Sequence, residues 1–369
     1  MKSYLFFGIL AVIVLAIIIV FSINGANGAL KIGLVAPLSG DTATWGYNTV
    51  AGVQLAIDEF NAKGGINGKK IELIVEDGLC TSEGGAKAYN ALLNNYDLVG
   101  MLGPVCSAEA GSGLPMGVTQ NIPNVIATAS SPGLTALGNN IFRVYPSDAF
   151  QGVYAADYIY NKLGKKKVSI IYVNNNWGQE ITNKFSAEYT KLGGVIESKD
   201  SVLQDQLDVK DLLIKVKNTN PELLYLPVYP KNLLSILKTK EEINLNVPIV
   251  GGDATLSEDS LKSGLGEGVM FTSPKFNLPN DFKTKIMAQK GNDFLVNVAA
   301  PFGYDAAKVL LSAMENANSL SHEDVIKELK KTSMEGISNP LIEFDEQGDL
   351  KNAAFQVMKI ENKESILVE

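Results

Sequence analysis

The residues best suited to chemistry are small hydroxyl side chains that follow two short apolar runs, residues 98–102 and 125–127. These hydroxyl residues are Ser107, Thr128, Ser130 and Ser131. Short apolar runs are typical of buried parallel strands, and open α/β sheets bind ligands beyond the carboxyl ends of such strands. Hydroxyls and free backbone N–H groups at the start of a following helix suit a small anion such as a carboxylate. These side chains could instead only cap helices, but two strand ends with the same chemistry favour a binding site.

The composition argues against an enzyme, a metal site or a bound cofactor. The one histidine, His322, lies in a Ser-His-Glu-Asp run that indicates a helix start. A nucleophile at Ser107 or Cys106 would therefore have no positioned base, and a histidine-rich metal site is excluded. The glycines between Gly111 and Gly117 do not have dinucleotide-loop spacing, and no Walker-type sequence occurs. We expect a binding protein without catalytic residues, metal or cofactor.

The charge and the length of the chain bear on its binding partner and on its number of lobes. The net charge of -8 and the pI near 5.0 do not suit a nucleic acid partner, which would need a basic face. At 369 residues the chain exceeds what one hydrophobic core usually spans. Two lobes are the natural expectation.

The N-terminus predicts the location. Residues 4–23 form an uncharged apolar run, preceded only by Lys2. As a helix the run would be about 30 Å long, enough to cross a bilayer. We predict that residues 1–29 are a membrane anchor that holds the large domain outside the cytoplasm. The alternative is a secretory signal cleaved near Ala26-Asn27-Gly28, which would release the protein into the periplasm or medium.

Two cysteines in an exported protein invite pairing. Cys80 and Cys106 each follow a predicted strand, residues 71–75 and 98–102, and consecutive strands usually lie close together. A bridge between them would contribute roughly 3–4 kcal/mol in the chain-entropy model. Two free buried thiols are the alternative that the residues leave open.

Strand and helix signals alternate along the chain. In the first half, predicted strands are residues 31–38, 70–76, 98–102, 125–127 and 141–145, with a helix containing Val50, Val53, Ile57 and Phe60 after the first. A second series follows, with helices at 148–163, 178–192, from 208 and from 231, and strands at 168–173, 195–200, 223–228, 248–251 and 268–273. The tail adds helices at 306–317 and 323–331 and a strand at 355–360. This alternation predicts parallel sheets with helices on both faces, and a chain that returns to lobes it has already built.

The start KIGLVAPLSGDTATWG, the following VQLAIDEFNAKGGINGKKIELIVED and the segment from Cys80 to Cys106 resemble type I periplasmic solute-binding proteins. The resemblance is strongest to the leucine/isoleucine/valine-binding branch that serves ABC importers, and it extends from about Lys31 to the C-terminal strand. It implies an α/β fold of two lobes, each a parallel sheet with flanking helices, joined by three crossover strands. Residues 30–146 with 278–350 would form the first lobe, and residues 147–277 with 351–369 the second.

The resemblance also implies a disulfide between Cys80 and Cys106 and a set of ligand-binding residues. The α-carboxylate of an amino acid would contact Ser107 and Ser130 and backbone N–H groups of Thr128 and Ser130. The ammonium would contact the Thr128 carbonyl, the Ser130 hydroxyl and Asp253. The aromatic walls would come from Trp45, Trp177 and Tyr229. On this basis we expect a monomer that captures an amino acid between its lobes and delivers it to an ABC permease.

Two departures from the branched-chain pattern bear on the ligand. Asp253 stands where these proteins usually have the longer Glu, and Trp177 stands where they usually have Tyr. Relatives of this fold also bind amides, urea and aromatic acids. An extracellular ligand sensor of the same fold and a binder of an amide or urea-type ligand are therefore the alternatives.

Overall fold

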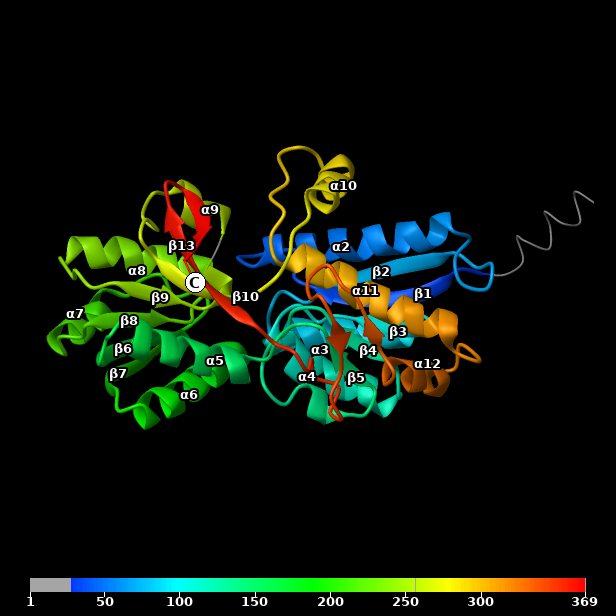
Figure 1. The fold of residues 1–369 in the computed structure, drawn as a ribbon, viewed down its shortest axis with the longest axis horizontal. Coiled ribbons are helices and arrows are strands. Elements are labelled where there is room, and N and C mark those ends of the chain that lie inside the picture. Colours follow the sequence, from blue (N-terminus) through cyan, green and yellow to red (C-terminus); the bar gives the residue numbers. More distant parts are fainter. Residues whose placement is uncertain (1–27, 256, 369) are drawn as a thin grey trace, which may run out of the picture.

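The computed structural model describes residues 28–255 and 257–368 and shows two α/β lobes side by side (Figure 1). The predicted anchor or signal at residues 1–29 lies almost wholly outside the described residues. Within the described part of the chain, no helix has the length and apolar character needed to cross a membrane. The predicted α/β class, with two lobes and connecting strands, is confirmed.

The first lobe is built on a five-stranded, all-parallel sheet. Its strands, in spatial order, are β2 (Ile71–Asp77), β1 (Leu30–Ala36), β3 (Leu98–Leu102), β4 (Asn124–Ile126) and β5 (Ile141–Arg143). Its helices are α2 (Ala43–Ala62), α3 (Ser82–Asn95), α4 (Ser107–Thr119), η1 (Thr135–Leu137), α10 (Asn280–Lys290), α11 (Ala299–Asn316) and α12 (His322–Leu329). A small antiparallel pair, β11 (Ser333–Met334) and β12 (Ile342–Glu343), completes the lobe.

Alternating apolar residues of β1 explain why helices cover both faces of this sheet. Ile32 and Leu34 pack into one cluster with α2 and α11, whereas Val35 packs into another with α3 and α4. Glycines let α2 and α11 approach closely, since a Cβ at Gly52 would lie 1.9 Å from the Ala300 carbonyl oxygen. The sheet is therefore a rigid platform with its carboxyl-terminal edge left free.

The second lobe is built on a seven-stranded mixed sheet. Its strands, in spatial order, are β14 (Glu364–Leu367), β13 (Phe355–Glu361), β10 (Met270–Pro274), β9 (Ile249–Gly251), β8 (Leu223–Leu226), β6 (Lys167–Val173) and β7 (Val195–Val202). Its helices are α5 (Asp148–Asp157), η2 (Tyr158–Lys162), α6 (Asn176–Lys191), α7 (Lys210–Asn218), α8 (Pro230–Glu242), η3 (Asp253–Thr255) and α9 (Glu258–Lys262). Only β13 and β14 run antiparallel to their neighbours.

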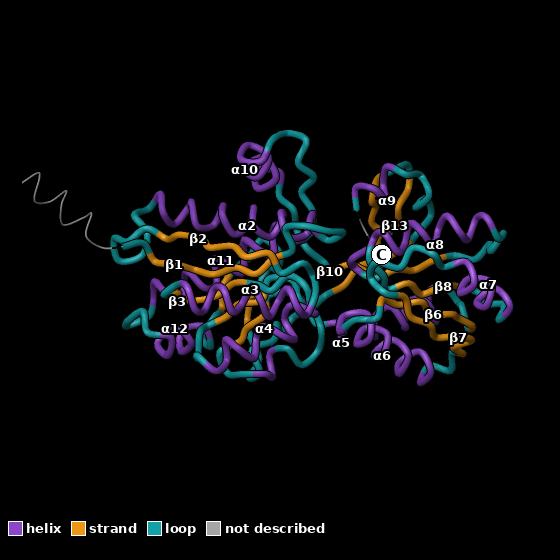
Figure 2. Tube along the Cα trace, turned by 180° about the vertical axis from the view of Figure 1, so that it is seen from behind, coloured by secondary structure: helices purple, strands orange, loops and turns teal. Residues whose placement is uncertain are grey.

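Three segments join the lobes, at residues 144–147, 275–279 and 351–354, which connect β5 to α5, β10 to α10 and the end of the first lobe to β13. The view from behind shows the same two bodies, with β10 lying between them (Figure 2). The predicted lobe boundaries themselves stay a prediction.

Several elements differ from the sequence-based expectation. The helix expected from residue 306 begins at Ala299, because Pro301 lies in its first turn, where a missing N–H costs nothing. The helix expected from residue 178 begins at Asn176, so Trp177 is helical. The helices α9 and α10 and the strands β11, β12 and β14 were not predicted; the three strands have only two to four residues each.

Candidate functional site

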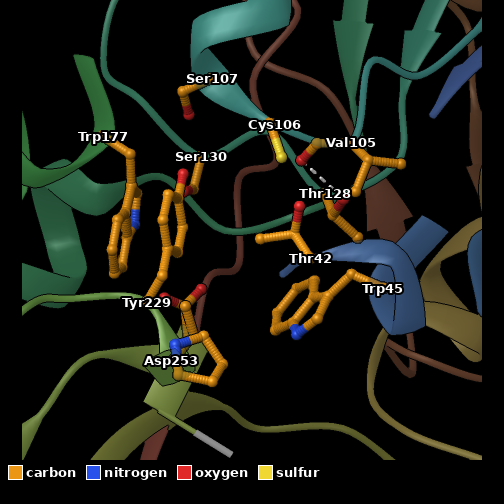
Figure 3. Close-up of a pocket in the computed structure, with 12 residues that line it drawn as sticks. Thr42, Trp45, Val105, Cys106, Ser107, Thr128, Ser130, Trp177, Tyr229 and Asp253 are labelled. Atoms are coloured by element: carbon orange, nitrogen blue, oxygen red, sulfur yellow. Dashed lines mark hydrogen bonds between the residues drawn. The ribbon is translucent and has the colours of Figure 1, made fainter. Parts of the chain in front are cut away.

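One pocket between the lobes is lined by all seven residues that were predicted to bind the ligand, whereas Ser131, the fourth hydroxyl residue named from the sequence, does not line it (Figure 3). These residues are Trp45, Ser107, Thr128, Ser130, Trp177, Tyr229 and Asp253. The remaining lining residues are Thr42, Val105, Cys106, Pro230 and Ala254. The pocket contains about 440 Å³ of space not filled by protein atoms, a volume that includes open solvent at its mouth.

The predicted hydroxyl residues of the first lobe follow β3 and β4, at the carboxyl edge of the sheet. Ser107 is the first residue of α4, and its Oγ accepts a hydrogen bond from the Ser131 N–H at 3.1 Å. The Thr128 hydroxyl donates to the Val105 carbonyl at 2.9 Å, and the Ser130 hydroxyl donates to Asp148 Oδ2 at 2.9 Å. None of these three hydroxyls caps a helix, so the capping interpretation is wrong for them. Among the described residues, the Ser107 hydroxyl proton has no acceptor and the Ser130 lone pairs have no donor.

The second lobe supplies an aromatic wall. Trp177 and Tyr229 stack with ring centroids 5.2 Å apart and an interplanar angle of 9°, as Figure 3 shows on one side of the pocket. The Tyr229 hydroxyl accepts from Asn175 Nδ2 at 3.2 Å and lies 3.4 Å from Cys80 Sγ of the first lobe. Trp45 stands across the pocket, edge-on to Tyr145 at 6.5 Å.

Asp253, just after β9, is buried at the lower end of the pocket in Figure 3. Its Oδ2 accepts a hydrogen bond from the Tyr145 hydroxyl at 2.7 Å. Its Oδ1 is buried and has no hydrogen-bonding partner among the described residues. Burial raises the pKa of Asp253, although the hydrogen bond from Tyr145 opposes the shift. A buried carboxylate oxygen without a donor is suited to a cationic partner.

A second buried acid, Asp148, lies in the same network. Burial raises the pKa of Asp148 well above its usual range, and the nearby charge of Asp253 raises it further. Gln151 links the two when its amide is assigned the orientation that satisfies its neighbours: its nitrogen then donates to Asp148 Oδ1 at 2.9 Å and its oxygen accepts from the Asp253 N–H at 3.0 Å. The guanidinium of Arg143 donates hydrogen bonds to Asp349 and to the Ser131 carbonyl, and not to either of these acids. The network thus concentrates acidic groups beside the pocket.

The predicted disulfide between Cys80 and Cys106 is confirmed. Glu109 is fully buried beside it, and its two oxygens accept the backbone N–H groups of Cys80 at 2.9 Å and of Cys106 at 3.0 Å. Burial raises the pKa of Glu109 to about 7 against the effect of these hydrogen bonds. The carboxyl group therefore fixes both ends of a bridge that lines the pocket at Cys106.

The lobes touch each other across the site. The Lys231 N–H, at the start of α8, donates to Asp41 Oδ2 at 3.2 Å. Together with the approach of Tyr229 to Cys80, this contact bridges the two lobes beside the pocket.

Sequence reasoning missed three groups of this site: Thr42, Tyr145 and Asp148. Tyr145 and Asp148 follow β5, a third neighbouring strand end, so the rule that identified Ser107 would also have found them. Asp148 instead looked like an ordinary acidic residue of a helix start. Thr42 lies in the turn between β1 and Trp45 and carried no separate signal.

Comparisons with known proteins agree with this architecture. A family model described as a periplasmic binding protein matches residues 29–365. A curated Leu/Ile/Val-binding protein of Citrobacter freundii is 25% identical over 337 residues, 89% of this chain and 90% of that protein. A solved leucine-binding protein from Thermotoga maritima is similar with a TM-score of 0.85 and 24% identity, over 92% of this chain and 98% of that one. A solute-binding protein from R. palustris, solved with benzoate, has a TM-score of 0.82 and 19% identity, over 92% and 96%.

Proposed function

The chain belongs to the periplasmic binding protein family, and we propose that it captures an amino acid of the branched-chain type between its lobes and delivers it to an ABC importer. Its relatives are solute-binding proteins rather than enzymes, and the family works outside the cytoplasm. We further propose that it acts as a monomer and that its N-terminal segment anchors it at the outer face of the membrane.

The observation that carries the proposal is the buried Asp253 Oδ1, which lacks a donor in the part of the chain the structure describes. A zwitterion loses much hydration when it is enclosed, so each of its charges needs fixed partners. Asp253 suits the ammonium group, through a charge-assisted hydrogen bond. The lone pairs of the Ser130 hydroxyl oxygen would accept a second hydrogen bond from the same ammonium group.

The carboxylate of the ligand suits the opposite chemistry at the start of α4. Ser107 is the first residue of that 13-residue helix, where backbone N–H groups and the helix dipole favour negative charge. Its hydroxyl proton is free to donate, because the Ser107 Oγ acts as acceptor towards Ser131. The ligand would thus lie with its carboxylate towards α4 and its ammonium towards Asp253.

Ligand capture couples to closure because the two ends of the proposed ligand contact different lobes. Ser107 belongs to the first lobe, and Asp253, Trp177 and Tyr229 belong to the second. A ligand that contacts both lobes only in the closed state shifts the population towards that state. The closed arrangement is then what an importer would recognise.

An aromatic acid is the contrasting ligand, since the stacked Trp177 and Tyr229 could pack on a ring. Such a ligand would bring no ammonium to Asp253 and would leave that buried oxygen unpaired, at a cost of about 1–3 kcal/mol or more. The geometry therefore favours the amino acid.

Isothermal titration calorimetry of the purified protein tests the proposal with leucine, isoleucine, valine, benzoate and urea as separate ligands. We expect saturable binding of at least one of the three amino acids and none of benzoate or urea. Binding of benzoate alone would overturn the amino-acid assignment. A screen by thermal shift gives the same answer, because a bound ligand stabilises the folded state by mass action.

A further inference from the structure

Thr42 is the one pocket-lining hydroxyl residue with no hydrogen-bonding partner in the described part of the chain. The other three hydroxyl groups of Ser and Thr residues in the lining, at Ser107, Thr128 and Ser130, each have a protein partner. Thr42 is also 95% buried, with a relative exposure of 5%. A buried hydroxyl without a partner normally costs about as much as a lost hydrogen bond, so it calls for an explanation.

Helix capping does not supply the explanation. Thr42 is the N-cap residue of α2, but its side chain makes no capping hydrogen bond. Elsewhere in the described chain, N-cap side chains do accept a backbone N–H of their helix, at Thr81, Ser147, Asn175 and Ser321. The Thr42 hydroxyl therefore does not accept the backbone hydrogen bond that an N-cap threonine usually accepts.

The position of Thr42 in the pocket separates it from the groups assigned to the amino-acid backbone of the ligand. In Figure 3 it lies with Trp45 on one side of the pocket, and Ser107 and Trp177 lie on the other. Trp45, Val105 and Thr128 lie near it, and the Thr128 hydroxyl already donates to the Val105 carbonyl. A buried hydroxyl without a protein partner discriminates sharply between ligands, because a ligand that cannot hydrogen-bond leaves it unpaired.

We propose that Thr42 is a specificity-determining residue, and that the ligand is an amino acid whose small side chain carries a hydrogen-bonding group, of the threonine type rather than purely aliphatic. The inference rests on the proposed function, because it takes the amino and carboxylate groups of the ligand as bound by Asp253 and Ser107. Threonine and valine have nearly the same shape and differ in one hydroxyl. They are therefore matched probes of the Thr42 hydroxyl.

Calorimetry with threonine and valine on the wild-type protein, Thr42→Val and Thr42→Ser tests the inference. We expect the wild-type protein to bind threonine about tenfold more tightly than valine, the ratio that one hydrogen bond supports. Thr42→Val should abolish or reverse this preference, and Thr42→Ser should keep it. Thr44→Val is the matched control, because Thr44 is exposed two residues away on α2 and should leave the ratio unchanged.

Thermal unfolding without ligand gives an independent readout. Thr42→Val should not lower the melting temperature, because the hydroxyl caps nothing, whereas Thr81→Ala, which removes a capping hydroxyl, should lower it by roughly 1–3 °C. A drop for Thr42→Val as large as that for Thr81→Ala would assign the hydroxyl to the fold and overturn the inference.

The outcomes separate the inference from the proposed function. If the wild-type protein binds leucine and valine well and shows no preference for threonine, the proposed function stands and this inference fails. If Thr42→Val leaves a threonine preference unchanged, the inference also fails. If the wild-type protein binds no amino acid, the proposed function fails and the inference fails with it.

Discussion

The Tyr145 hydroxyl donates a hydrogen bond to Asp253 Oδ2 at 2.7 Å, across 108 residues of sequence. Tyr145 lies in the first segment that connects the lobes, and Asp253 lies in the second lobe just after β9. The hydrogen bond holds one carboxylate oxygen in place and leaves Oδ1 without a donor among the described residues. The acid is thereby oriented before any ligand arrives, which limits the ordering cost of binding.

Replacing Asp253 with Asn should weaken amino-acid binding by more than about 2 kcal/mol, or roughly 30-fold, because a buried ammonium would lose its charged partner. Calorimetry of Asp253→Asn measures the loss. Asp205→Asn is the matched control, since Asp205 is an exposed acid of the same lobe and should bind ligand normally. Unchanged affinity in Asp253→Asn would remove Asp253 from the site.

Stability should fall as the pH rises from about 4.5 to about 7 because of Glu109. Its pKa is about 7 in the folded protein, against an ordinary value of 4.5, so the folded state holds this proton more tightly than the unfolded chain does. The stabilisation is fully present below pH 4.5 and is lost as the pH rises through 7. Urea unfolding at several pH values should show a smaller fall in Glu109→Gln than in the wild-type protein, and an unchanged profile in the exposed control Glu323→Gln. Equal slopes in the wild-type protein and Glu109→Gln would contradict the assignment.

Removing the disulfide should lower both stability and affinity. The bridge spans 26 residues of sequence, for which the chain-entropy model gives roughly 3–4 kcal/mol. Affinity should fall as well, because Cys106 lines the pocket and Cys80 lies against the Tyr229 hydroxyl. Unfolding and calorimetry of the Cys80→Ser, Cys106→Ser double variant measure the two effects. A variant that loses stability and keeps full affinity would show that the bridge serves the fold alone.

Ligand should change the intrinsic fluorescence, because the two tryptophans of the chain both line the pocket. Trp177→Phe and Trp45→Phe separate their signals, and each single variant should keep part of the change. The measurement is a fluorescence titration of the wild-type protein and of each variant with leucine. A ligand that binds by calorimetry and leaves the emission of the wild-type protein unaltered would count against a shared aromatic wall.

Deleting residues 1–29 should leave ligand binding intact and impair uptake in cells, because the predicted anchor would raise the local concentration of the protein near its importer. Calorimetry of the truncated protein and uptake of labelled amino acid by cells that produce it are the paired measurements. Normal uptake by the truncated protein would contradict a role of residues 1–29 in uptake.

Local patterns in the sequence were enough to predict most strands of the two large sheets. They also predicted the hydroxyl residues that the first lobe contributes to the site. Strand β3 has the predicted bounds, because an apolar run between polar residues leaves little choice. Asp253 and Tyr229 were identified through the resemblance, since nothing local distinguishes them from turn residues. Thr42 could not be found in this way, because its significance lies in a hydrogen bond that it does not make, and only the folded packing reveals that.

The three connecting segments have a consequence for biosynthesis. Helix α11, which packs along α2 in the first lobe, begins only at Ala299, and β13, which pairs with β10 in the second lobe, begins only at Phe355. A nascent chain that has emerged from the ribosome as far as β10 would thus contain most strands of both sheets. Neither lobe would be complete, because α11 and β13 would not yet have been synthesised. Folding to the native state must wait for the last residues to be translated, which exposes the half-built chain to export machinery and chaperones for most of its synthesis.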